Sequence, residues 1–422
     1  MRKIIVQKFG GTSVADTDKI KNVAKIVIKE KENGNDVVVV VSAMGHTTDY
    51  LVKMAKDLSP NPSEREMDML LSTGEGVSIA LLAMAIQAQG YDAVSFNAMQ
   101  VGILTENIHS KARILEIKTD KLKQNLKEGK IIVIAGFQGV TENGEITTLG
   151  RGGSDTSAVA LAAALNAERC DIYTDVEGVY TTDPRVVPHA SKLKEISYEE
   201  MLELAHAGAN VLHPRSVETA KLNNVPLRVR SSFKLNDLGT LILGVDKMEL
   251  NNPVAGVAQD LSQARIVVCD VPDKPGVAAK LFSRLAQENI SVDMIIQSYA
   301  RKVSNTNDIA FTIDKSDLNK TVKALEALKT EIGATGEIEV DENIAKVSIV
   351  GAGMIDRPGV ASAMFETLAE QGINIRMIST SEIKISCLVD KEQAPLAVKA
   401  LHTVFNLDCD DVADVKGDLP DV

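Results

Sequence analysis

Residues 3–13 read KIIVQKFGGTS, and a helix-like segment from Asp16 to Lys31 follows them. A short apolar strand that runs into adjacent glycines, hydroxyl side chains and then a helix is suited to hold an anion. Glycines let backbone N–H groups turn toward a phosphate, and the helix N-terminus adds partial positive charge. Lys8 stands at the end of this strand, within reach of outer phosphates. The layout predicts a nucleotide site; the alternative is an ordinary strand-to-helix turn with a solvated lysine.

Size and composition narrow the class of protein. A chain of 422 residues is too long for one hydrophobic core, so two or three domains are expected. Aromatic residues make up 3% of the chain, tryptophan is absent, and the formal charge is −12. These values argue against nucleic-acid partners, which need stacking platforms or a basic surface. An anionic substrate would have to be attracted by a few local cations.

No stretch of the sequence predicts a membrane span. The N-terminus has no long apolar region, and the longest apolar run, from Ala158 to Leu165, is far too short to cross a bilayer. We therefore expect a cytoplasmic protein.

The cysteines and histidines do not predict a metal site. No C-x-x-C pair or H-E-x-x-H motif occurs, and Gly208 and Pro214 make a single helix through His206 and His213 doubtful. We expect the cysteines to be small buried hydrophobes and the histidines to be structural or solvated. These residues are Cys170, Cys269, Cys387 and Cys409, and His46, His109, His189, His206, His213 and His402.

Strand-like and helix-like segments alternate as far as about Leu243. The predicted strands are Ile4–Phe9, Val37–Ser42, Ala93–Phe96, Ile131–Ala135, Asp171–Thr174, Leu227–Val229 and Thr240–Leu243. The predicted helices lie near 16–32, 47–57, 64–89, 110–128, 154–167, 197–206 and 214–223. Because Val37–Val41 shows no polar alternation, both faces of that strand should be covered, which favours a three-layer α/β domain. Ligands of such domains gather at the carboxyl ends of the strands.

Three further motifs lie where that rule places a ligand. Ser42 to Asp49 is again small and hydroxylated before a helix, and Glu75 lies in a mostly apolar helical region. A lone acid there is either solvated or holds a cation. After a predicted hairpin around Glu142-Asn-Gly144 comes Gly150-Arg-Gly-Gly-Ser-Asp155, a second glycine-rich junction with an arginine suited to a carboxylate or phosphate. Two such junctions suggest an enzyme with two anionic substrates; a chance loop is the alternative.

The C-terminal part repeats itself. Asp273-Lys-Pro-Gly-Val-Ala, a helix to Asn289 and a strand Ile290–Gln297 recur 83 residues later as Asp356-Arg-Pro-Gly-Val-Ala, a helix to Gln371 and a strand from Ile373 to Thr380. Each copy has the strand and helix order of a ferredoxin-like module. Gly351-Ala-Gly353 imitates a dinucleotide fingerprint, but Pro358 opens the helix and the last glycine is missing, so we reject a nicotinamide site.

Five strings in order resemble the aspartokinases of the amino-acid kinase superfamily. They are KFGGTSV at 8–14, SAMGHTTDYL at 42–51, STGE at 72–75, GRGGSD at 150–155 and TDVEGVYTTDPR at 174–185. The resemblance implies a three-layer αβα kinase domain followed by two ferredoxin-like (βαββαβ) ACT modules. The implied domains are 1–245 for the kinase, 246–263 for a linker with a strand that joins the second module, 264–341 for the first ACT domain and 342–416 for the second.

The resemblance also implies the reaction. It is the ATP-dependent phosphorylation of the side-chain carboxylate of L-aspartate, the first step toward lysine, threonine and methionine, with magnesium arriving on the nucleotide and no resident metal. Lys8 and Asp155 match the family's catalytic pair, and Asp155 would orient groups without acting as a base. Matched to ATP are Lys8, Phe9, Gly10, Gly11, Ser13, Ser42, Thr174, Asp175, Tyr180, Asp183 and Arg185; matched to aspartate are Thr47, Glu75, Arg151, Gly152, Gly153 and Ser154. His46 lies where an acid is common in relatives, and we assign it no role.

Feedback by lysine, threonine or both follows from the same resemblance. The ACT modules would pair into at least a dimer and bind effectors between them, and an internal start near Met248 could produce a separate regulatory subunit. The implied effector residues are Asp273, Val292, Asp293, Met294, Gln297, Asn374, Ile375, Ser381 and Glu382. Three alternatives stay open: another amino-acid kinase such as a glutamate 5-kinase, a catalytically silent amino-acid sensor, and ACT modules that only pack.

Overall fold

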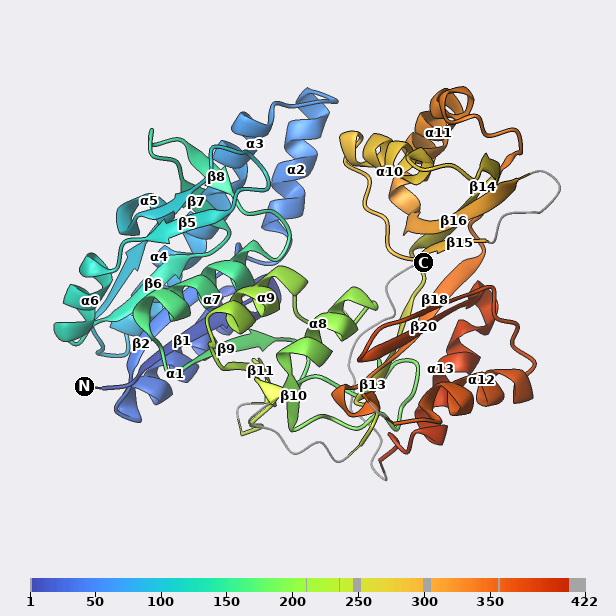
Figure 1. Cartoon of the computed structure of the whole chain (residues 1–422). Helices are drawn as coiled ribbons and strands as arrows, with labels where there is room; N and C mark the ends of the chain where they lie inside the picture. Colours follow the sequence, from blue (N-terminus) through green and yellow to red (C-terminus); the bar gives the residue numbers. More distant parts are fainter. Residues whose placement is uncertain are drawn as a thin grey trace. The chain divides into compact units, whose positions relative to one another are not determined.

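The computed structural model describes residues 2–209, 211–234, 236–245, 252–298, 305–355 and 357–409. The chain forms two compact units (Figure 1). The first comprises Met1–Tyr180, Lys192–His206 and Asn210–Glu249, and the second comprises Thr181–Ser191, Ala207–Ala209 and Leu250–Val422. Met248, Asp356 and the end of the implied second ACT domain, after Cys409, lie outside the described residues.

An eight-stranded sheet forms the centre of the first unit, in the order β10-β12-β11-β9-β1-β2-β6-β3. Its strands are parallel except for the antiparallel pair β11 and β12. Their bounds are β1 Ile4–Phe9, β2 Asp36–Val41, β3 Ala93–Phe96, β6 Ile131–Ala135, β9 Arg169–Thr174, β10 Glu195–Ser197, β11 Leu227–Ser231 and β12 Thr240–Leu243. All seven strands predicted from sequence are present, with bounds within two residues.

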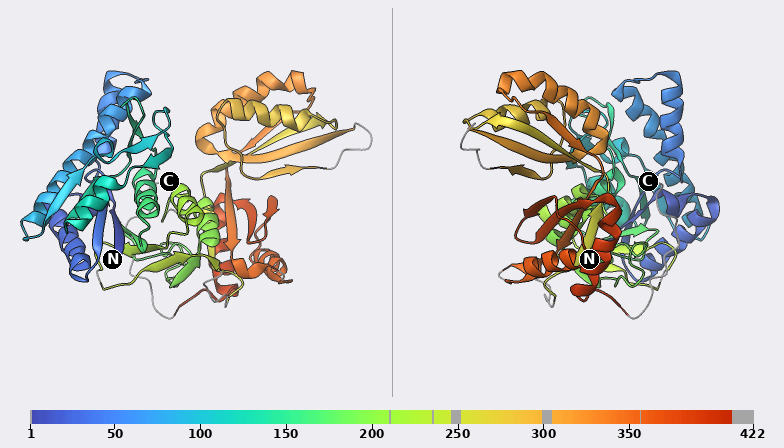
Figure 2. Two further views of the ribbon diagram at one scale, coloured as in Figure 1. Left: turned by 60° about the vertical axis from the view of Figure 1, so that its left-hand side comes forward. Right: turned by 90° about the vertical axis from the view of Figure 1, so that its right-hand side faces the viewer.

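Helices cover both faces of this sheet (Figure 2). On one face, α1 and α4 bury alternate residues of β1, β2 and β6 in a common core that includes Phe9, Val39 and Leu82. On the other face α7 packs on β1, β2 and β9. The helices are α1 Thr17–Glu32, α2 Thr47–Leu58, α3 Glu64–Leu71, α4 Thr73–Gln87, α5 Ala98–Val101, α6 Asp120–Lys127, α7 Gly153–Leu165, α8 Tyr198–His206 and α9 Pro214–Leu222. The predicted three-layer αβα architecture is confirmed.

Two helix predictions need correction. The segment predicted as a helix over 110–128 contains the strand β5 (Ile114–Ile117), and its helix, α6, begins only at Asp120. The strand forms because its backbone pairs with β4 (Ile103–Thr105). The helix predicted over 64–89 is divided at Ser72, where the hydroxyls of Ser72 and Thr73 donate back to carbonyl oxygens of the preceding turn.

A second, four-stranded sheet of the first unit was not predicted. Its order is β5-β4-β7-β8, with β7 Gln138–Val140 and β8 Ile146–Thr148 joined as the hairpin that the Glu142-Asn-Gly144 turn indicated. The hairpin leads directly into the glycine-rich junction at 150–153.

One segment of the described residues, Glu64–Gln87, is long and apolar enough to span a membrane by length and composition. In the structure its α4 part packs on α1, β3 and β6, with Ile79, Leu82 and Ile86 in the core. Core helices of soluble proteins pass the same test, so this segment is weak evidence of a span.

The second unit contains two modules: the first has the order βαββαβ, and the second has the order βαββα, with its fourth strand supplied by a segment that precedes it in the chain. In the first, β14 (Gln263–Pro272), β15 (Ile295–Gln297), β16 (Thr306–Asp314) and β17 (Ile338–Asp341) form one sheet with α10 (Val277–Gln287) and α11 (Leu318–Ile332). In the second, β18 (Ile344–Val350), β19 (Met377–Thr380) and β20 (Lys384–Asp390) accompany α12 (Val360–Glu370) and α13 (Ala394–Val404). In each module both helices lie on one face of the sheet (Figures 1 and 2). The predicted fold class is confirmed here too.

The strands after α10 and α12 are shorter than predicted. They start at Ile295 and Met377 instead of Ile290 and Ile373. The side chains of Ile290 and Ile373 are buried in the helix-packing cores of their modules, and the chain reaches the sheet only afterwards.

The second module takes in two segments that are distant in sequence. β13 (Gly256–Asp260) pairs antiparallel with β18 and supplies the fourth strand of the sheet. The segment Thr181–Ser191 also belongs to this unit: Val257 N donates to Thr181 O (2.7 Å), and Val187 is buried in the module's core. The Thr181 hydroxyl lies 2.8 Å from Nε2 of the fully buried His402.

The cysteines are free thiols. Cys170 and Cys387 are buried as predicted, and burial raises the pKa of the Cys387 thiol to about 12. Cys269 and Cys409 are only half-buried, which corrects the expectation for these two.

Candidate functional site

The residues that directly follow β1, β2 and β6 lie side by side at one edge of the large sheet. Ser42 N donates to Phe9 O (3.1 Å), and Gly136 N donates to Val41 O (3.0 Å). Because these strands are parallel, their carboxyl ends meet at this edge, where ligands of α/β domains bind. The motifs singled out from the sequence gather around it.

Lys8 and Asp155 form an ion pair at this edge. Lys8 Nζ lies 2.6 Å from Asp155 Oδ1, and the two side chains are 12% and 13% exposed. Lys8 belongs to β1 and faces α7, in whose first turn Asp155 lies, while the next residue, Phe9, faces the opposite layer. A carboxylate that holds an ammonium at a ligand-binding edge can fix the position of that ammonium for contact with a phosphate.

The glycines after β1 allow a close backbone approach. A Cβ atom at Gly11 would lie 2.9 Å from Ala43 O and 3.0 Å from Gly45 O, so no other residue fits without displacement. A Cβ at Gly10 would lie 3.5 Å from Lys8 Nζ. The turn continues as a short 3₁₀ helix, Gly11–Val14, in which the buried Ser13 hydroxyl donates to Ser232 Oγ (2.9 Å). Ser13 therefore already has a protein partner.

Ser42 connects the end of β2 to the start of α7. Its hydroxyl donates to Ser154 Oγ (2.9 Å), and Ser154 is the neighbour of Asp155 in α7. A Cβ at Gly136 would lie only 2.7 Å from Ser154 Oγ, so glycine at the end of β6 makes room for this contact. The two serines and the Lys8–Asp155 pair form one contiguous set.

Glu75 is a buried acid beside the same residues. Its side chain lies in the first turn of α4, the residue is 3% exposed, and Oε1 accepts a hydrogen bond from Ala43 N (3.2 Å). Oε2 has no hydrogen-bond partner among the described residues. Burial raises the pKa of Glu75 to about 7, while backbone N–H groups and the Gln138 amide lower it by less. A cationic ligand would satisfy this carboxylate.

Arg151 lies on a tight turn between β8 and α7. Gly150 and Gly152 have φ of 78° and 68°, the left-handed region that favours glycine. A Cβ at Gly152 would meet the His213 side chain at 2.3 Å, and one at Gly153 would meet Phe137 at 2.8 Å. Arg151 itself is exposed, and no residue in the described ranges forms a hydrogen bond or ion pair with its guanidinium. It is available to an anion.

Thr47 and His46 begin α2, close in sequence to Ala43. The Thr47 hydroxyl donates to Met44 O (2.6 Å) and has no free proton left to donate. His46 is exposed with Nδ1 3.2 Å from Asp49 Oδ2, which indicates a solvated residue.

The predicted nucleotide segment divides between the two units. Thr174 is the last residue of β9, and its hydroxyl donates to Asp175 Oδ1 (3.0 Å). Tyr180 forms an isolated antiparallel β-bridge with Lys192, and all of these residues belong to the first unit. Asp183 and Arg185 lie in the second unit, where the guanidinium of Arg185 contacts the Asp183 carboxylate at 2.7 Å.

One predicted ATP residue has its side chain in the core. The Phe9 ring is fully buried and stacks on Tyr173, with ring centroids 4.5 Å apart. Only its backbone is left for a ligand, because alternate residues of β1 face opposite layers.

The predicted effector residues lie in the second unit, in loops except for Gln297, which ends β15. Asp273 is exposed and accepts from Asn307 Nδ2 (3.3 Å), and Asp293 forms a close ion pair with Lys346 of β18. The Met294 side chain is 3% exposed and packs in a cluster with Ile344, Met377 and Leu388 of the other module. Val292 and Ile375 pack against the cores of their modules. The exposed members are Asp273, Asp293, Gln297, Asn374, Ser381 and Glu382.

Sequence reasoning missed several residues that support the site. Ser232 follows β11 at the same edge, so the strand-end rule that found Ser42 also applied to it. Asp68 and Arg215 hold the Arg151 turn, but no sequence motif marks them, because their hydrogen-bond partners come from segments distant in sequence. Within the part of the chain that the structure describes, no group of three or more His, Cys, Asp or Glu suits a metal ion.

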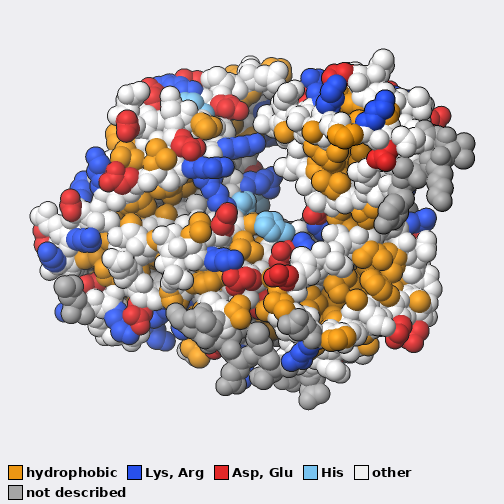
Figure 3. Space-filling view, viewed as in Figure 1, with side chains coloured by type: hydrophobic (Ala, Val, Ile, Leu, Met, Phe, Trp, Pro, Cys, Tyr) orange, Lys and Arg blue, Asp and Glu red, His pale blue; other side chains and the backbone are white. Residues whose placement is uncertain are grey.

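A cavity of about 450 Å³ lies elsewhere, on the sheet face that α1 covers. None of the site residues lines it. Arg169 in this cavity pairs with Asp171 (3.0 Å) and Glu30 (3.1 Å), and Arg230 lies over the Tyr173 ring, 5.4 Å from its centroid. These cations are engaged with the protein. On the face seen in Figure 3, Lys and Arg occur in small groups between acidic and uncharged side chains, so no continuous basic surface is visible there.

Comparisons with known proteins match both parts of the chain. The model of the amino acid kinase family matches residues 3–231, and the ACT domain model matches residues 266–328 and 347–405. The chain is 56% identical over 404 residues to an aspartokinase of Bacillus sp. (strain MGA3), covering 96% of this chain and 97% of that relative.

Two solved structures of E. coli aspartokinase III are similar over nearly the whole chain. The complex with aspartate and ADP, an R-state structure, has 30% identity and a TM-score of 0.79, covering 95% of this chain and 99% of that one. The complex with lysine and aspartate, a T-state structure, has 30% identity and a TM-score of 0.74, covering 96% and 99%.

Proposed function

Because this chain belongs to the aspartokinases of the amino acid kinase family, we propose that Lys8, Glu75, Arg151 and Asp155 carry the family's reaction in it. That reaction is the ATP-dependent phosphorylation of the side-chain carboxylate of L-aspartate. The observation that supports this assignment best is the contiguous set at the sheet edge. In it the Lys8–Asp155 pair adjoins Ser154, Ser42 and, through Ala43, the carboxylate of Glu75.

The chemical difficulty of this reaction is charge. The side-chain carboxyl group of aspartate has a pKa of about 3.9 and is already ionised at neutral pH, so no base is needed to remove a proton from it. A carboxylate at about 4 Å from the γ-phosphate costs on the order of 4 kcal/mol per pair of unit charges at an effective dielectric constant near 20. Cations must offset this repulsion, and catalysis is positioning plus electrostatics.

Each residue has a role that its surroundings suit. Lys8 binds the phosphates and stabilises the charge in transfer, and Asp155 holds the Lys8 ammonium in place at 2.6 Å. Glu75 binds the substrate ammonium, which supplies the partner that Oε2 lacks within the described chain. Arg151 binds a substrate carboxylate with its free guanidinium, as a planar fork that lysine cannot replace. Ser154, Gly152, Gly153 and Thr47 shape the aspartate pocket.

We propose that ATP lies along the glycine turn after β1. Gly10 and Gly11 keep the backbone clear of side chains there, and Thr174, Asp175 and Tyr180 continue the same edge. Asp183 and Arg185, which the resemblance matches to ATP, are proposed as further ATP residues. Magnesium would be held chiefly by the nucleotide phosphates, and it would neutralise part of their charge.

The ACT modules are proposed as the regulatory part. We propose 1–245 as the kinase domain, 264–341 and 342–416 as the ACT domains, and the strand within 246–263 as part of the second one. Support comes from the pairing of β13 with β18 and from the ranges matched by the ACT model. Lysine, threonine or both would bind at the exposed effector residues, and the modules would pair two or more copies of the chain in the cytoplasm. A separately translated regulatory subunit is also proposed.

An assay with hydroxylamine tests the reaction directly. An acyl phosphate reacts with hydroxylamine to give a hydroxamate, so the purified protein with Mg·ATP and L-aspartate should release ADP and form aspartyl hydroxamate in equal amounts. The same assay with L-glutamate as acceptor distinguishes an aspartate kinase from a glutamate kinase. If neither acid causes ADP release, the protein is a catalytically silent amino-acid sensor. Product with glutamate alone, or none at all, would contradict the proposal.

A further inference from the structure

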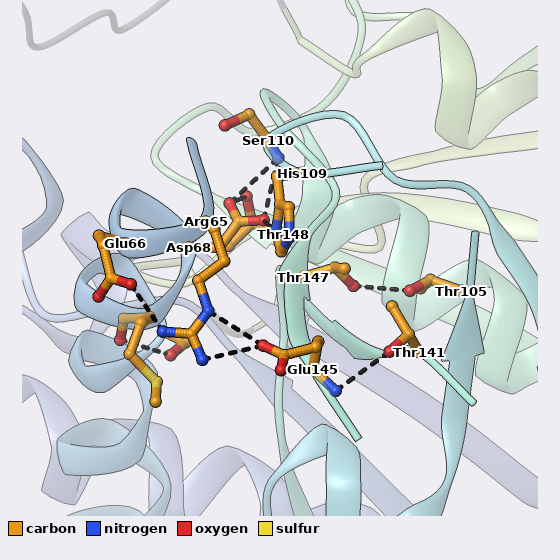
Figure 4. A network of polar contacts seen from close by, with 12 residues as sticks. Arg65, Glu66, Asp68, Thr105, His109, Ser110, Thr141, Glu145, Thr147 and Thr148 are labelled. Carbon is orange, nitrogen blue, oxygen red and sulfur yellow. Dashed lines mark hydrogen bonds and ion pairs between the residues drawn. The ribbon is translucent and has the colours of Figure 1, made fainter. Parts of the chain in front are cut away.

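Asp68 is a fully buried carboxylate that joins three segments of the first unit (Figure 4). Its side chain projects from α3. Thr148 Oγ1 donates to Oδ1 (2.6 Å), Ser110 N donates to both oxygens (3.1 and 3.0 Å), and His109 Nδ1 lies 2.8 Å from Oδ2. Burying a carboxylate costs free energy, and these donors offset that cost.

These contacts lead to both proposed aspartate-binding residues. α3 continues through Ser72 into α4, where Glu75 lies in the first turn. Thr148 is the last residue of β8, and Arg151 follows it by three positions. Between them, Gly150 passes so close to Ser110 O that a Cβ there would lie at 2.9 Å. Asp68 therefore fixes the start of the Arg151 turn against the helices that carry Glu75.

Arg215 of α9 holds the same turn at the neighbouring residue. Its guanidinium donates to Leu149 O (2.9 Å) and Ala112 O (2.7 Å), and burial lowers the pKa of Arg215. The backbone adds a hydrogen bond from Ala112 N to Thr148 O (3.0 Å). Arg151 has no partner of its own in the described chain, so the position of its guanidinium depends on how rigidly this backbone is held.

We propose that Asp68 is a positioning residue for aspartate recognition, acting on Arg151 through Thr148 and Ser110. This inference rests on the proposed function of Arg151. Asp68 does not touch substrate. It holds the backbone that carries the Arg151 guanidinium, and a displacement of a binding group by about 1 Å can lower the rate roughly 100-fold.

The test measures the KM of aspartate and the KM of ATP separately for Asp68→Asn. The amide keeps the shape of the side chain but loses the charge and one acceptor. We expect the KM of aspartate to rise roughly 10- to 100-fold and the KM of ATP to stay within about twofold. Thr148→Val removes one donor from the same network and should also raise the KM of aspartate, by a smaller factor. This variant replaces Asp68→Asn in the test if Asp68→Asn does not fold. An equal rise in both KM values, or no rise, would overturn the inference.

A double-mutant comparison separates positioning from mere stability. In an Arg151→Lys background the Asp68→Asn substitution should raise the KM of aspartate by no more than about twofold, because the group it positions is already gone. The same factor in both backgrounds would show that Asp68 acts elsewhere.

Arg65→Gln is the matched control. Arg65 also joins α3 to the β7–β8 hairpin, through Glu145 at 3.0 Å, but on the exposed surface (Figure 4). It should leave both KM values unchanged. If the unmodified protein does not phosphorylate aspartate, the proposed function fails; if it does and Asp68→Asn behaves like the control, only the present inference fails.

Discussion

Lys8 Nζ lies 2.6 Å from Asp155 Oδ1. This ion pair joins the carboxyl end of β1 in the large sheet to the first turn of α7. It is mostly shielded from water, so the position of the ammonium is fixed before any ligand binds. A preorganised cation of this kind stabilises developing charge without reorganisation at the moment of reaction.

Lys8→Ala should lower kcat by about 1,000-fold or more and leave the thermal unfolding temperature close to that of the unmodified protein. The reason is loss of the cation that the transferring phosphoryl group requires. Lys3→Ala is the control, because Lys3 directly precedes the same strand and pairs with Glu168 at 2.6 Å on the exposed surface. Near-normal turnover of the Lys8 variant at saturating substrates would refute the assignment.

Asp155→Asn should lower kcat without changing the shape of its pH profile at saturating aspartate. The amide holds Lys8 less well, but no proton has to be removed from a substrate carboxylate that is already ionised. The measurement is kcat from pH 5.5 to 9 for both proteins. Loss of an ionisation near neutrality in the variant would make Asp155 a base.

The KM of aspartate should depend on pH through Glu75, whose pKa burial raises to about 7. Below that value the carboxyl group is protonated and cannot pair with the substrate ammonium. We therefore expect the KM of aspartate to rise about tenfold for each pH unit below 7 and to level off above it. Glu75→Gln should have a high KM at every pH, and the KM of ATP should show no such dependence. A flat aspartate profile in the unmodified enzyme would contradict the assignment.

The same shift predicts a change in stability with pH. A carboxyl group with a raised pKa binds more protons in the folded than in the unfolded state, so stability falls as pH rises from about 4.5 to about 7. The full effect is about 3 kcal/mol in the free energy of unfolding. Glu75→Gln should remove this slope and be the more stable protein at pH 8, as measured by urea unfolding without ligands. The exposed Glu66→Gln should retain it.

Lysine and threonine, singly and together, should change activity through the second unit. Asp293→Asn would break the close ion pair with the nearly buried Lys346, which joins the two ACT modules. We expect the effector concentration for half inhibition to shift by about tenfold, within the usual range of coupling free energies, while the KM of aspartate without effector stays constant. Glu331→Gln, at an exposed pair with Lys280, is the control. No response to saturating amounts of both amino acids would end the regulatory proposal.

Buried, β-branched segments were predictable from sequence because both of their faces are covered. The fully buried strand Ile131–Ala135 matches its predicted bounds for this reason. The sequence predicts helix for the strand Ile114–Ile117 because this segment is short and half-exposed, and its pairing with β4 makes it a strand. Short strands without a buried run carry little local signal.

Candidate site residues could be proposed from the sequence where their chemistry lies in one motif, as at Lys8, Arg151 and Asp155. The unpaired oxygen of Glu75 and the network around Asp68 depend on contacts between distant segments, which no spacing rule encodes. The same holds for Asp183 and Arg185, whose segment folds with the second unit although it follows β9 in the chain.

Segments that precede the ACT modules in the chain fold with the second of them, and this limits where the protein can be divided into fragments. A fragment that ends near residue 245 would keep Thr181–Ser191 yet leave behind the hydrophobic partners that bury Val187. A fragment that begins after Asp260 would expose the bare edge of β18, a template for adventitious strand pairing. Recombinant dissection at the apparent boundaries should therefore produce insoluble pieces, and any independently expressed regulatory polypeptide has to start upstream of Gly256.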